Sequence, residues 1–307
     1  MLPHRPFLGS VTAATVLVLT ACGSPGDTAD VGADPLQPAL TVVASTNVYG
    51  SIAAAVGGDR AKVISLITDP AADPHSYEST PADAVTITEA TIVVFNGGGY
   101  DDWVSRLTES AGGRRTVIDV SGLSGLEPAE DEFNEHFWYS LPTTQKVATQ
   151  LAADLGTADP AYAAEYTVNA KQFNEQVDGL IEKAEAIGAA TPGARVAVTE
   201  PVPGYLIETA GLMNATPDEF AEAIEEDTDP PAAVLQETLA LFADDPVRAL
   251  ILNGQTQTPT TDQVRQAAEA AGVPVVEMTE TLPAGQTEYT GWMSAQIDEL
   301  ADAVARA

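Results

Sequence analysis

The sequence predicts an α/β protein with two lobes, each a parallel-type β-sheet flanked by helices, joined by one long rigid helix. Three observations predict this fold: short β-branched runs recur along the chain, helical patterns separate them, and one uninterrupted helical pattern lies near the middle. Strands that alternate with helices are typical of βαβ units, which build parallel sheets. With 307 residues, the chain is long enough for two ordinary domains or one large one.

The expected strands are short apolar runs bounded by turn residues. They are LTVVAST (40–46), VISLI (63–67), TIVVFN (91–96), VAVT (196–199), ALILN (249–253) and VPVVEM (273–278). One helix start is well marked, because Thr80 can cap the helix, Pro81 suits its first position and Asp83 lies in its first turn. The last helical pattern carries an apolar stripe that we expect in the core: Tyr289, Trp292, Met293, Ile297, Leu300 and Val304.

The longest helical pattern extends from Pro160 to Ala189 without another proline. Its apolar residues follow a spacing of three and four and form one stripe: Phe173, Val177, Leu180, Ile181, Ala184 and Ile187. About 30 residues make a helix of roughly 45 Å, longer than one small domain needs. We therefore expect an N-terminal lobe over 40–158, a linking helix over 159–190 and a C-terminal lobe over 191–307. One continuous sheet with a long crossover helix is the alternative.

Residues 1–21 are expected to form a signal peptide, with Arg5 as its positive charge and an apolar segment over about 7–19 that is short for a membrane span. The segment LTAC (19–22) resembles a bacterial lipoprotein box, in which cleavage precedes the cysteine and its thiol is lipidated. Cys22 is the only cysteine of the chain. We expect it to anchor an extracytoplasmic protein to the outer face of the cell membrane, with 22–39 as a flexible tether rich in Gly, Pro and Asp.

The charge balance excludes several classes of partner. The chain has 13 Lys and Arg against 45 Asp and Glu, a formal charge of −32, which would repel nucleic acids and anionic headgroups. We therefore expect no nucleic-acid partner, and membrane contact through the lipid anchor only. A single cysteine also excludes an internal disulfide framework, a thiolate zinc cluster and an iron–sulfur site.

Two histidines remain once His4 is assigned to the signal peptide. His75 lies in the polar loop TDPAADPHSYESTP, and His136 lies in DEFNEHFWYSLP, between acidic and aromatic residues. Glu200 and Glu280 follow expected strands and should emerge at the carboxyl edge of a sheet, where parallel α/β sheets bind ligands. Imidazole and carboxylate together suit Mn, Fe or Zn. With 45 Asp and Glu residues in the chain, position alone does not identify these two glutamates as metal ligands.

Five motifs carry a family resemblance: VVASTNVYGSIAAAVGGDRAKVISLI, DPHSYESTPAD, IVVFNGGGYDDW, EHFWYSLP and TEPVPGYL. From about residue 40 to its end, the chain resembles the metal-binding solute-binding lipoproteins of bacterial manganese and zinc ABC importers. The resemblance implies two lobes bridged by a long helix, with the metal at their interface. It implies His75, His136 and Glu200 as the first three ligands and Glu280 as the fourth. Relatives usually have Asp at the fourth position, and the neighbouring Glu277 is an alternative.

The resemblance implies a binding protein, not an enzyme, that delivers a divalent transition metal to an ABC permease and acts as a monomer. Mn²⁺ is the favoured metal, because the third position is Glu200 and no His-rich loop precedes His136. Zn²⁺ comes next, and Fe²⁺ is a further candidate. The alternatives are a secreted metallohydrolase, for which no HExxH motif exists in the sequence, and a cell-surface adhesin with an incidental metal.

Other polar segments are expected to be structural. The sequence NGGG (96–99) follows a strand but lacks the Lys-Ser/Thr of a phosphate-binding loop, so we expect a tight turn. The acidic runs EPAEDEFNE (127–135) and DEFAEAIEEDTD (218–229) are expected at the solvated surface. A role for the first run in gathering cations near the site is the alternative.

Overall fold

The computed structural model describes residues 40–306 except 71, 73, 127–133 and 244–245. Two four-stranded sheets lie within one compact unit that spans residues 36–307, and every strand pair in them is parallel. The expected signal peptide, Cys22 and the tether lie outside the described residues. Within the described part of the chain, no helix is both long enough and apolar enough to cross a membrane.

The first lobe contains a sheet with the strand order β2-β1-β3-β4. Its strands are β1 (Leu40–Thr46), β2 (Ala61–Ile67), β3 (Ile92–Phe95) and β4 (Thr116–Asp119). Its helices are α1 (Asn47–Gly57), α2 (Pro81–Thr88), α3 (Asp102–Ala111) and α4 (Val120–Ser124), with a 3-10 turn η1 (Gly58–Arg60). The predicted start of α2 is confirmed, because Thr80 and Asp83 form a reciprocal capping box and Pro81 is the first helical residue.

The second lobe repeats this topology with the strand order β6-β5-β7-β8. Its strands are β5 (Arg195–Val198), β6 (Met213–Asn214), β7 (Ala249–Asn253) and β8 (Val275–Met278). Its helices are α7 (Gly204–Thr209), α8 (Asp218–Glu225), α9 (Ala232–Ala240), α10 (Pro259–Ala271) and α11 (Tyr289–Arg306). In both sheets the order reverses beside the first strand, so each has a crevice at the carboxyl ends of its central strands.

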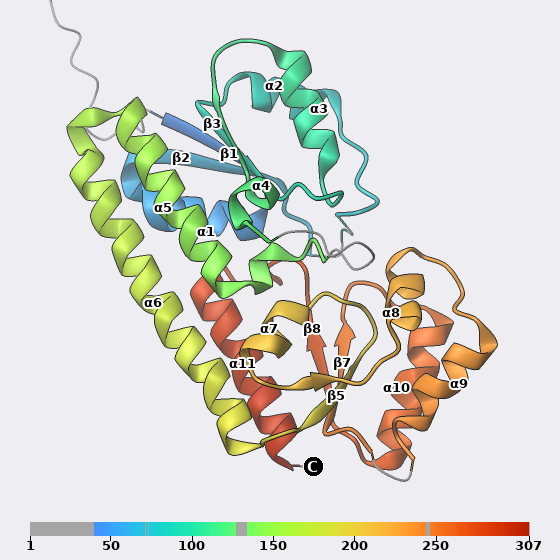
Figure 1. Ribbon diagram of the computed structural model, residues 1–307. Helices are drawn as coiled ribbons and strands as arrows, with labels where there is room; N and C mark the ends of the chain where they lie inside the picture. Colours follow the sequence, from blue (N-terminus) through green and yellow to red (C-terminus); the bar gives the residue numbers. More distant parts are fainter. Residues whose placement is uncertain (1–39, 71, 73, 127–133, 244–245, 307) are drawn as a thin grey trace, which may run out of the picture. The chain divides into compact units, whose positions relative to one another are not determined.

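The long helix is α6 (Ala163–Ala190), which follows α5 (Leu141–Ala158) and a 3-10 turn η3 (Pro160–Tyr162). In Figure 1, α6 runs beside α5 at the first lobe and beside α11 at the second. Five residues of the predicted stripe are buried, and Ile181 is half-buried. The two-lobe prediction with a long linking helix is therefore confirmed. The alternative of one continuous sheet is wrong, because no strand pair among the described residues joins the two sheets.

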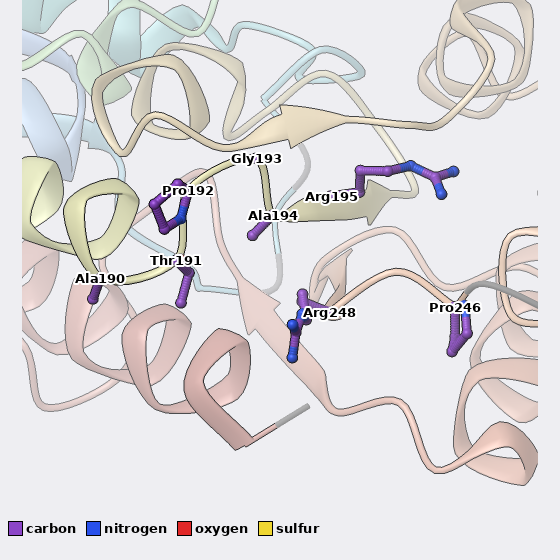
Figure 2. Close-up of a pocket in the computed structure, with 8 residues that line it drawn as sticks. All are labelled: Ala190, Thr191, Pro192, Gly193, Ala194, Arg195, Pro246 and Arg248. Carbon is purple, nitrogen blue, oxygen red and sulfur yellow. The ribbon is translucent and has the colours of Figure 1, made fainter.

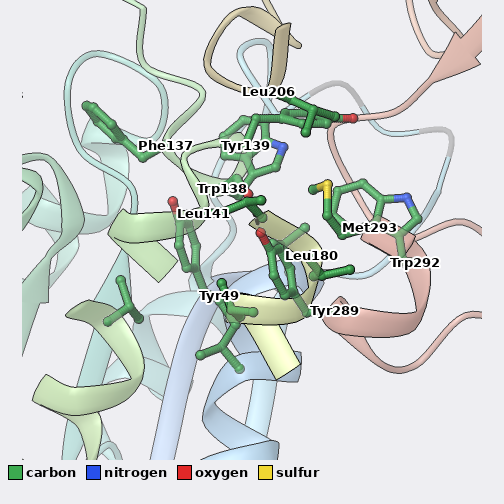
Figure 3. Close-up of a cluster of buried hydrophobic side chains, with 14 of the residues drawn as sticks. Tyr49, Phe137, Trp138, Tyr139, Leu141, Leu180, Leu206, Tyr289, Trp292 and Met293 are labelled. Atoms are coloured by element: carbon green, nitrogen blue, oxygen red, sulfur yellow. Dashed lines mark hydrogen bonds between the residues drawn. The ribbon is translucent and has the colours of Figure 1, made fainter. Parts of the chain in front are cut away.

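One of the apolar clusters contains residues of both lobes and of the long helices. Figure 3 shows its aromatic part, in which residues of η2 (Phe137–Tyr139) lie against side chains of α11. The predicted stripe of α11 is buried in this core. The Tyr289 hydroxyl donates a hydrogen bond of 2.7 Å to the carbonyl oxygen of Trp138. The segment that directly follows His136 is thus fixed by the shared core.

Candidate metal site

Three of the four predicted site residues come from loops at the carboxyl edges of the two sheets. His75 follows β2, Glu200 follows β5 and Glu280 follows β8. His136 has a different origin, because it directly precedes η2 and is positioned by the buried aromatic residues after it. His136, Glu200 and Glu280 are buried, whereas the His75 side chain keeps 25% of its surface exposed. Of the four predicted residues, His75 is thus the one whose side chain solvent reaches most.

Three of the four predicted residues form a compact group. His75, His136 and Glu280 each contribute one ligand atom, and these atoms lie within 4.8 Å of one another. Nε2 of His75 is 3.6 Å from Oε2 of Glu280. Ligand atoms on opposite sides of one transition-metal ion are about 4 Å apart, since each bond measures about 2.0–2.2 Å. The group therefore has the dimensions of a single-ion site.

Glu200 lies beside this group and is tied to it through an asparagine. Nδ2 of Asn253 donates to Oε2 of Glu200 at 2.7 Å and to Oε1 of Glu280 at 2.8 Å. The hydroxyl of Thr256 donates to the other oxygen of Glu200. Asn253 ends β7, so it stands at the same sheet edge as the two acids that it joins. Glu277, the alternative fourth ligand, is an exposed residue within β8.

His136 is held in one ring orientation. Oδ1 of Asn134 accepts the backbone N–H of His136 at 2.9 Å and lies 2.8 Å from Nδ1 of the ring. Nδ2 of Asn134 donates to the carbonyl oxygen of Pro201 at 2.8 Å, which fixes the amide with its oxygen toward the histidine. Burial, and then the nearby His75, lower the pKa of His136 well below its usual value. The ring is therefore neutral at pH 7, which is the form that binds metals.

Two further glutamates reach the site that the sequence did not single out. Oε1 of Glu135 is 3.7 Å from Nδ1 of His75, and Oε1 of Glu225 is 3.4 Å from Nε2 of His136. His75, Glu135 and Glu225 form a second group of ligand atoms within 4.8 Å of one another. Burial, followed by the charges of neighbouring glutamates including Glu135, Glu200 and Glu280, raises the pKa of Glu225 to about 9. Carboxylates thus converge on the two histidines.

The prediction that the whole run 218–229 is solvated surface is therefore wrong at Glu225. This residue ends α8 and lies four residues after the buried Ala221, so it follows the buried face of the helix. That spacing was the available signal in the sequence. Glu135 is the last residue of the other acidic run, of which 127–133 lie outside the described residues.

The glycine-rich segment after β3 is a turn, as predicted. Gly97, Gly98 and Gly99 all have positive φ angles, and the backbone N–H groups of Asn96 and Gly97 donate to the buried carboxylate of Asp101 at 2.8 and 2.7 Å. Burial raises the pKa of Asp101 to about 6. The Asn96 side chain in turn donates to the carbonyl oxygen of Glu135 at 2.8 Å. The turn thus supports the segment that carries His136.

Hydrogen bonds also connect the site loops of the two lobes. Nε2 of Gln255 donates to the carbonyl oxygens of Pro70 and Ala72, at 3.0 and 3.1 Å, in the loop before His75. Oε1 of the same side chain accepts the backbone N–H of Glu280 at 2.6 Å. Gln255 therefore connects the loop that precedes His75 to the loop that carries Glu280.

A pocket at the opposite edge of the second sheet differs in character. It has a volume of about 400 Å³ and borders the amino ends of β5 and β7 (Figure 2). Its lining consists of Ala190, Thr191, Pro192, Gly193, Ala194, Arg195, Pro246 and Arg248. Two arginines make this pocket unsuited to a cation. The carboxyl edge, where imidazoles and carboxylates meet, is the candidate metal site.

Solved structures share the fold of this chain. TroA, a periplasmic zinc-binding protein from Treponema pallidum, superposes with a TM-score of 0.72 at 20% identity, over 86% of this chain and 99% of that one. The SBP FpvC from Pseudomonas aeruginosa, solved in complex with Mn²⁺, superposes with a TM-score of 0.70 at 23% identity, over 87% and 98%. Both share the two-lobe fold.

Sequence relatives match a shorter region. The manganese-binding lipoprotein MntA of Halalkalibacterium halodurans is 27% identical over 168 residues, which is 54% of each chain. The iron-binding protein YfeA of Yersinia pestis is 26% identical over 181 residues, or 58% of each chain. The chain thus matches little more than half the length of these relatives. A family model matches residues 42–303, and the chain therefore belongs to the family of zinc-uptake complex component A periplasmic proteins (ZnuA).

Proposed function

We propose that the protein binds one divalent transition-metal ion between its lobes and delivers it to an ABC permease, so that the ion is cargo and not a resident cofactor. The observation that carries this proposal is the group formed by His75, His136 and Glu280, whose ligand atoms lie within 4.8 Å of one another. Glu200 joins it through Asn253. A family of uptake components favours transport over the alternative of a metallohydrolase.

Manganese is the first candidate for the cargo. Neutral imidazoles bind Mn²⁺, Fe²⁺ and Zn²⁺ alike, whereas several carboxylates add hard oxygen donors that allow the coordination numbers above four that Mn²⁺ accepts. The names of relatives point the same way, since one is manganese-binding and another iron-binding. Zn²⁺ would still bind such donors tightly by the Irving–Williams order, so the metal transported and the metal bound most tightly can differ.

The arrangement also suggests how the ion is enclosed. His75 and His136 belong to the first lobe, and Glu200 and Glu280 belong to the second. The hydrogen bonds of Gln255 and the one between Tyr100 and Glu280 connect the two pairs of loops. Release to a permease would require these bonds to break, so the closed arrangement retains the ion until the partner engages.

A lipid anchor would place this binding protein beside its permease. Relatives named as lipoproteins support an anchor on Cys22, at the outer face of the cell membrane. An acyl chain adds about 0.8 kcal/mol of membrane affinity per buried methylene, so two chains suffice to hold a folded domain at the surface. The protein would act there as a monomer, as each binding site is built from one chain.

Calorimetric titration of the metal-stripped protein with Mn²⁺ and Zn²⁺ tests the proposal. We expect one ion per chain, and at least a tenfold loss of affinity, about 1.4 kcal/mol, in His75→Ala, His136→Ala and Glu200→Ala. Parental affinities for both metals in both histidine variants would show that the site lies elsewhere.

A further inference from the structure

A buried nitrogen and a buried oxygen face each other at the site without a hydrogen-bond partner. Nε2 of His136 and Oε1 of Glu225 are both inaccessible to solvent, and neither forms a hydrogen bond with the described residues. The two atoms are 3.4 Å apart. Buried polar atoms are almost always satisfied in proteins, so each such exception needs an explanation.

The hydrogen-bond network around His136 shows what this pair lacks. Because Oδ1 of Asn134 can only accept, the proton of the neutral ring resides on Nδ1. Nε2 therefore presents a lone pair to Glu225. The raised pKa of Glu225 keeps its carboxyl protonated at pH 7 in the metal-free protein, and once that proton is lost the carboxylate also has only lone pairs to offer. Two acceptors that face each other in a buried place are stabilised when a positive ion binds both.

Neighbouring ligand atoms complete the surroundings of such an ion. The same carboxylate belongs to the group with His75 and Glu135, and His75 also belongs to the group with His136 and Glu280. The separation of 3.4 Å suits two ligands in adjacent positions on one metal, with bonds of about 2.1 Å. Glu225 comes from α8, an element that supplies none of the four predicted ligands.

We propose that Glu225 is an additional ligand of the cargo ion, which it binds together with Nε2 of His136. This inference deepens the proposed metal-binding function and rests on it. A further carboxylate raises the number of donors above four and adds a hard oxygen, which favours Mn²⁺ or Fe²⁺ over tetrahedral Zn²⁺. Glu225 is thus a residue that determines metal selectivity, contributed by α8 of the second lobe.

The substitution Glu225→Gln tests the proposal, because it removes the charge and keeps the size of the side chain. We expect Mn²⁺ affinity to fall at least tenfold, about 1.4 kcal/mol, and Zn²⁺ affinity to stay within a few-fold of the parent. Glu225→Asp should retain more Mn²⁺ affinity than Glu225→Gln. The visible absorption spectrum of the Co²⁺ complex should also change in Glu225→Gln, since it reports coordination number.

Glu226→Gln is the matched control, because Glu226 is the next residue, is exposed and carries the same charge. Equal losses of Mn²⁺ affinity in the two variants would show that the effect arises from long-range charge and not from ligation, and would overturn the proposal. Unchanged Mn²⁺ affinity and an unchanged Co²⁺ spectrum in Glu225→Gln would also overturn it, while leaving the metal site intact if His136→Ala still abolishes binding. Circular dichroism of each variant confirms folding.

Discussion

The hydroxyl of Tyr100 donates a hydrogen bond of 3.1 Å to Oε2 of Glu280. Both side chains are 1% exposed, and they belong to different lobes. The ring of Tyr100 also contacts His75 edge-on, with centroids 4.7 Å apart. One tyrosine therefore orients a carboxylate from the second lobe and packs against a histidine of the first.

We expect Tyr100→Phe to weaken Mn²⁺ binding about tenfold, because groups that orient metal ligands commonly contribute factors of this size. The phenyl ring keeps the packing but removes the donor to Glu280. Tyr166→Phe, which removes a hydroxyl 3.3 Å from Asp159 and outside the site, is the control and should bind like the parent. Calorimetric titration measures both, and parental affinity in Tyr100→Phe would show that this bond does not position Glu280.

Glu200→His should weaken the binding of Mn²⁺ much more than the binding of Zn²⁺. The substitution replaces a hard and potentially bidentate donor by a nitrogen, which brings the site closer to a tetrahedral zinc site. We expect at least a tenfold loss for Mn²⁺ and a change within a few-fold for Zn²⁺. Thermal shifts should then persist with zinc and shrink with manganese, because a ligand of the folded state raises its melting temperature. Equal losses for both metals would assign Glu200 no selective role.

The stability of the metal-free protein should depend on pH through Asp101. Burial raises its pKa from 3.8 to about 6, so between these values the folded state binds more protons than the unfolded state. Protonation of Asp101 therefore stabilises the folded state at low pH, and this stabilisation is lost as the pH rises through about 6. The free energy of unfolding of Asp101→Asn, relative to that of the parent, should therefore rise by about 2–3 kcal/mol as the pH increases from 4 to 7.

Urea unfolding at several pH values measures this difference. The absolute stability of Asp101→Asn is not the readout, because the amide loses one acceptor for the backbone N–H groups of Asn96 and Gly97. Glu109→Gln, at an exposed position of α3, is the control and should track the parent. A pH-independent difference between Asp101→Asn and the parent would contradict the assignment.

Cys22→Ser should move the protein from the membrane fraction to the soluble or secreted fraction and leave metal binding unchanged. The segment 23–39 has too little apolar surface to hold a bilayer without acyl chains. Immunoblots of cell fractions provide the readout. Continued membrane association of the variant would rule out the lipid anchor.

Most of the fold could be predicted from periodicity, and the exceptions have local causes. All six predicted strands exist, because their apolar residues are needed in the core. Two strands were not predicted: β4, three of whose four residues are exposed, and β6, whose two residues are exposed. Such edge strands depend on pairing with a neighbour and leave little hydrophobic pattern in the sequence.

The site was predictable only in part. His75, Glu200 and Glu280 follow strands, so topology alone brings them to sheet edges. His136 follows no strand, and its place depends on the burial of the aromatic residues after it. The scarcity of histidines made it a candidate, and the family resemblance implied its role as a ligand. Glu225 was missed because its acidic neighbours are exposed, although its helix buries one face. One residue of an acidic run can thus be buried although its neighbours are solvated, and the charge pattern alone does not identify it.

The most direct measurement is a crystal structure of the Mn²⁺-loaded protein with anomalous data collected at the manganese edge. We predict one strong anomalous peak within about 2.0–2.5 Å of Nε2 of His136 and of a carboxylate oxygen of Glu280, with His75 in the same coordination sphere. An anomalous peak elsewhere in the chain, or its absence from this group when manganese is bound in solution, would contradict the assignment of the metal site.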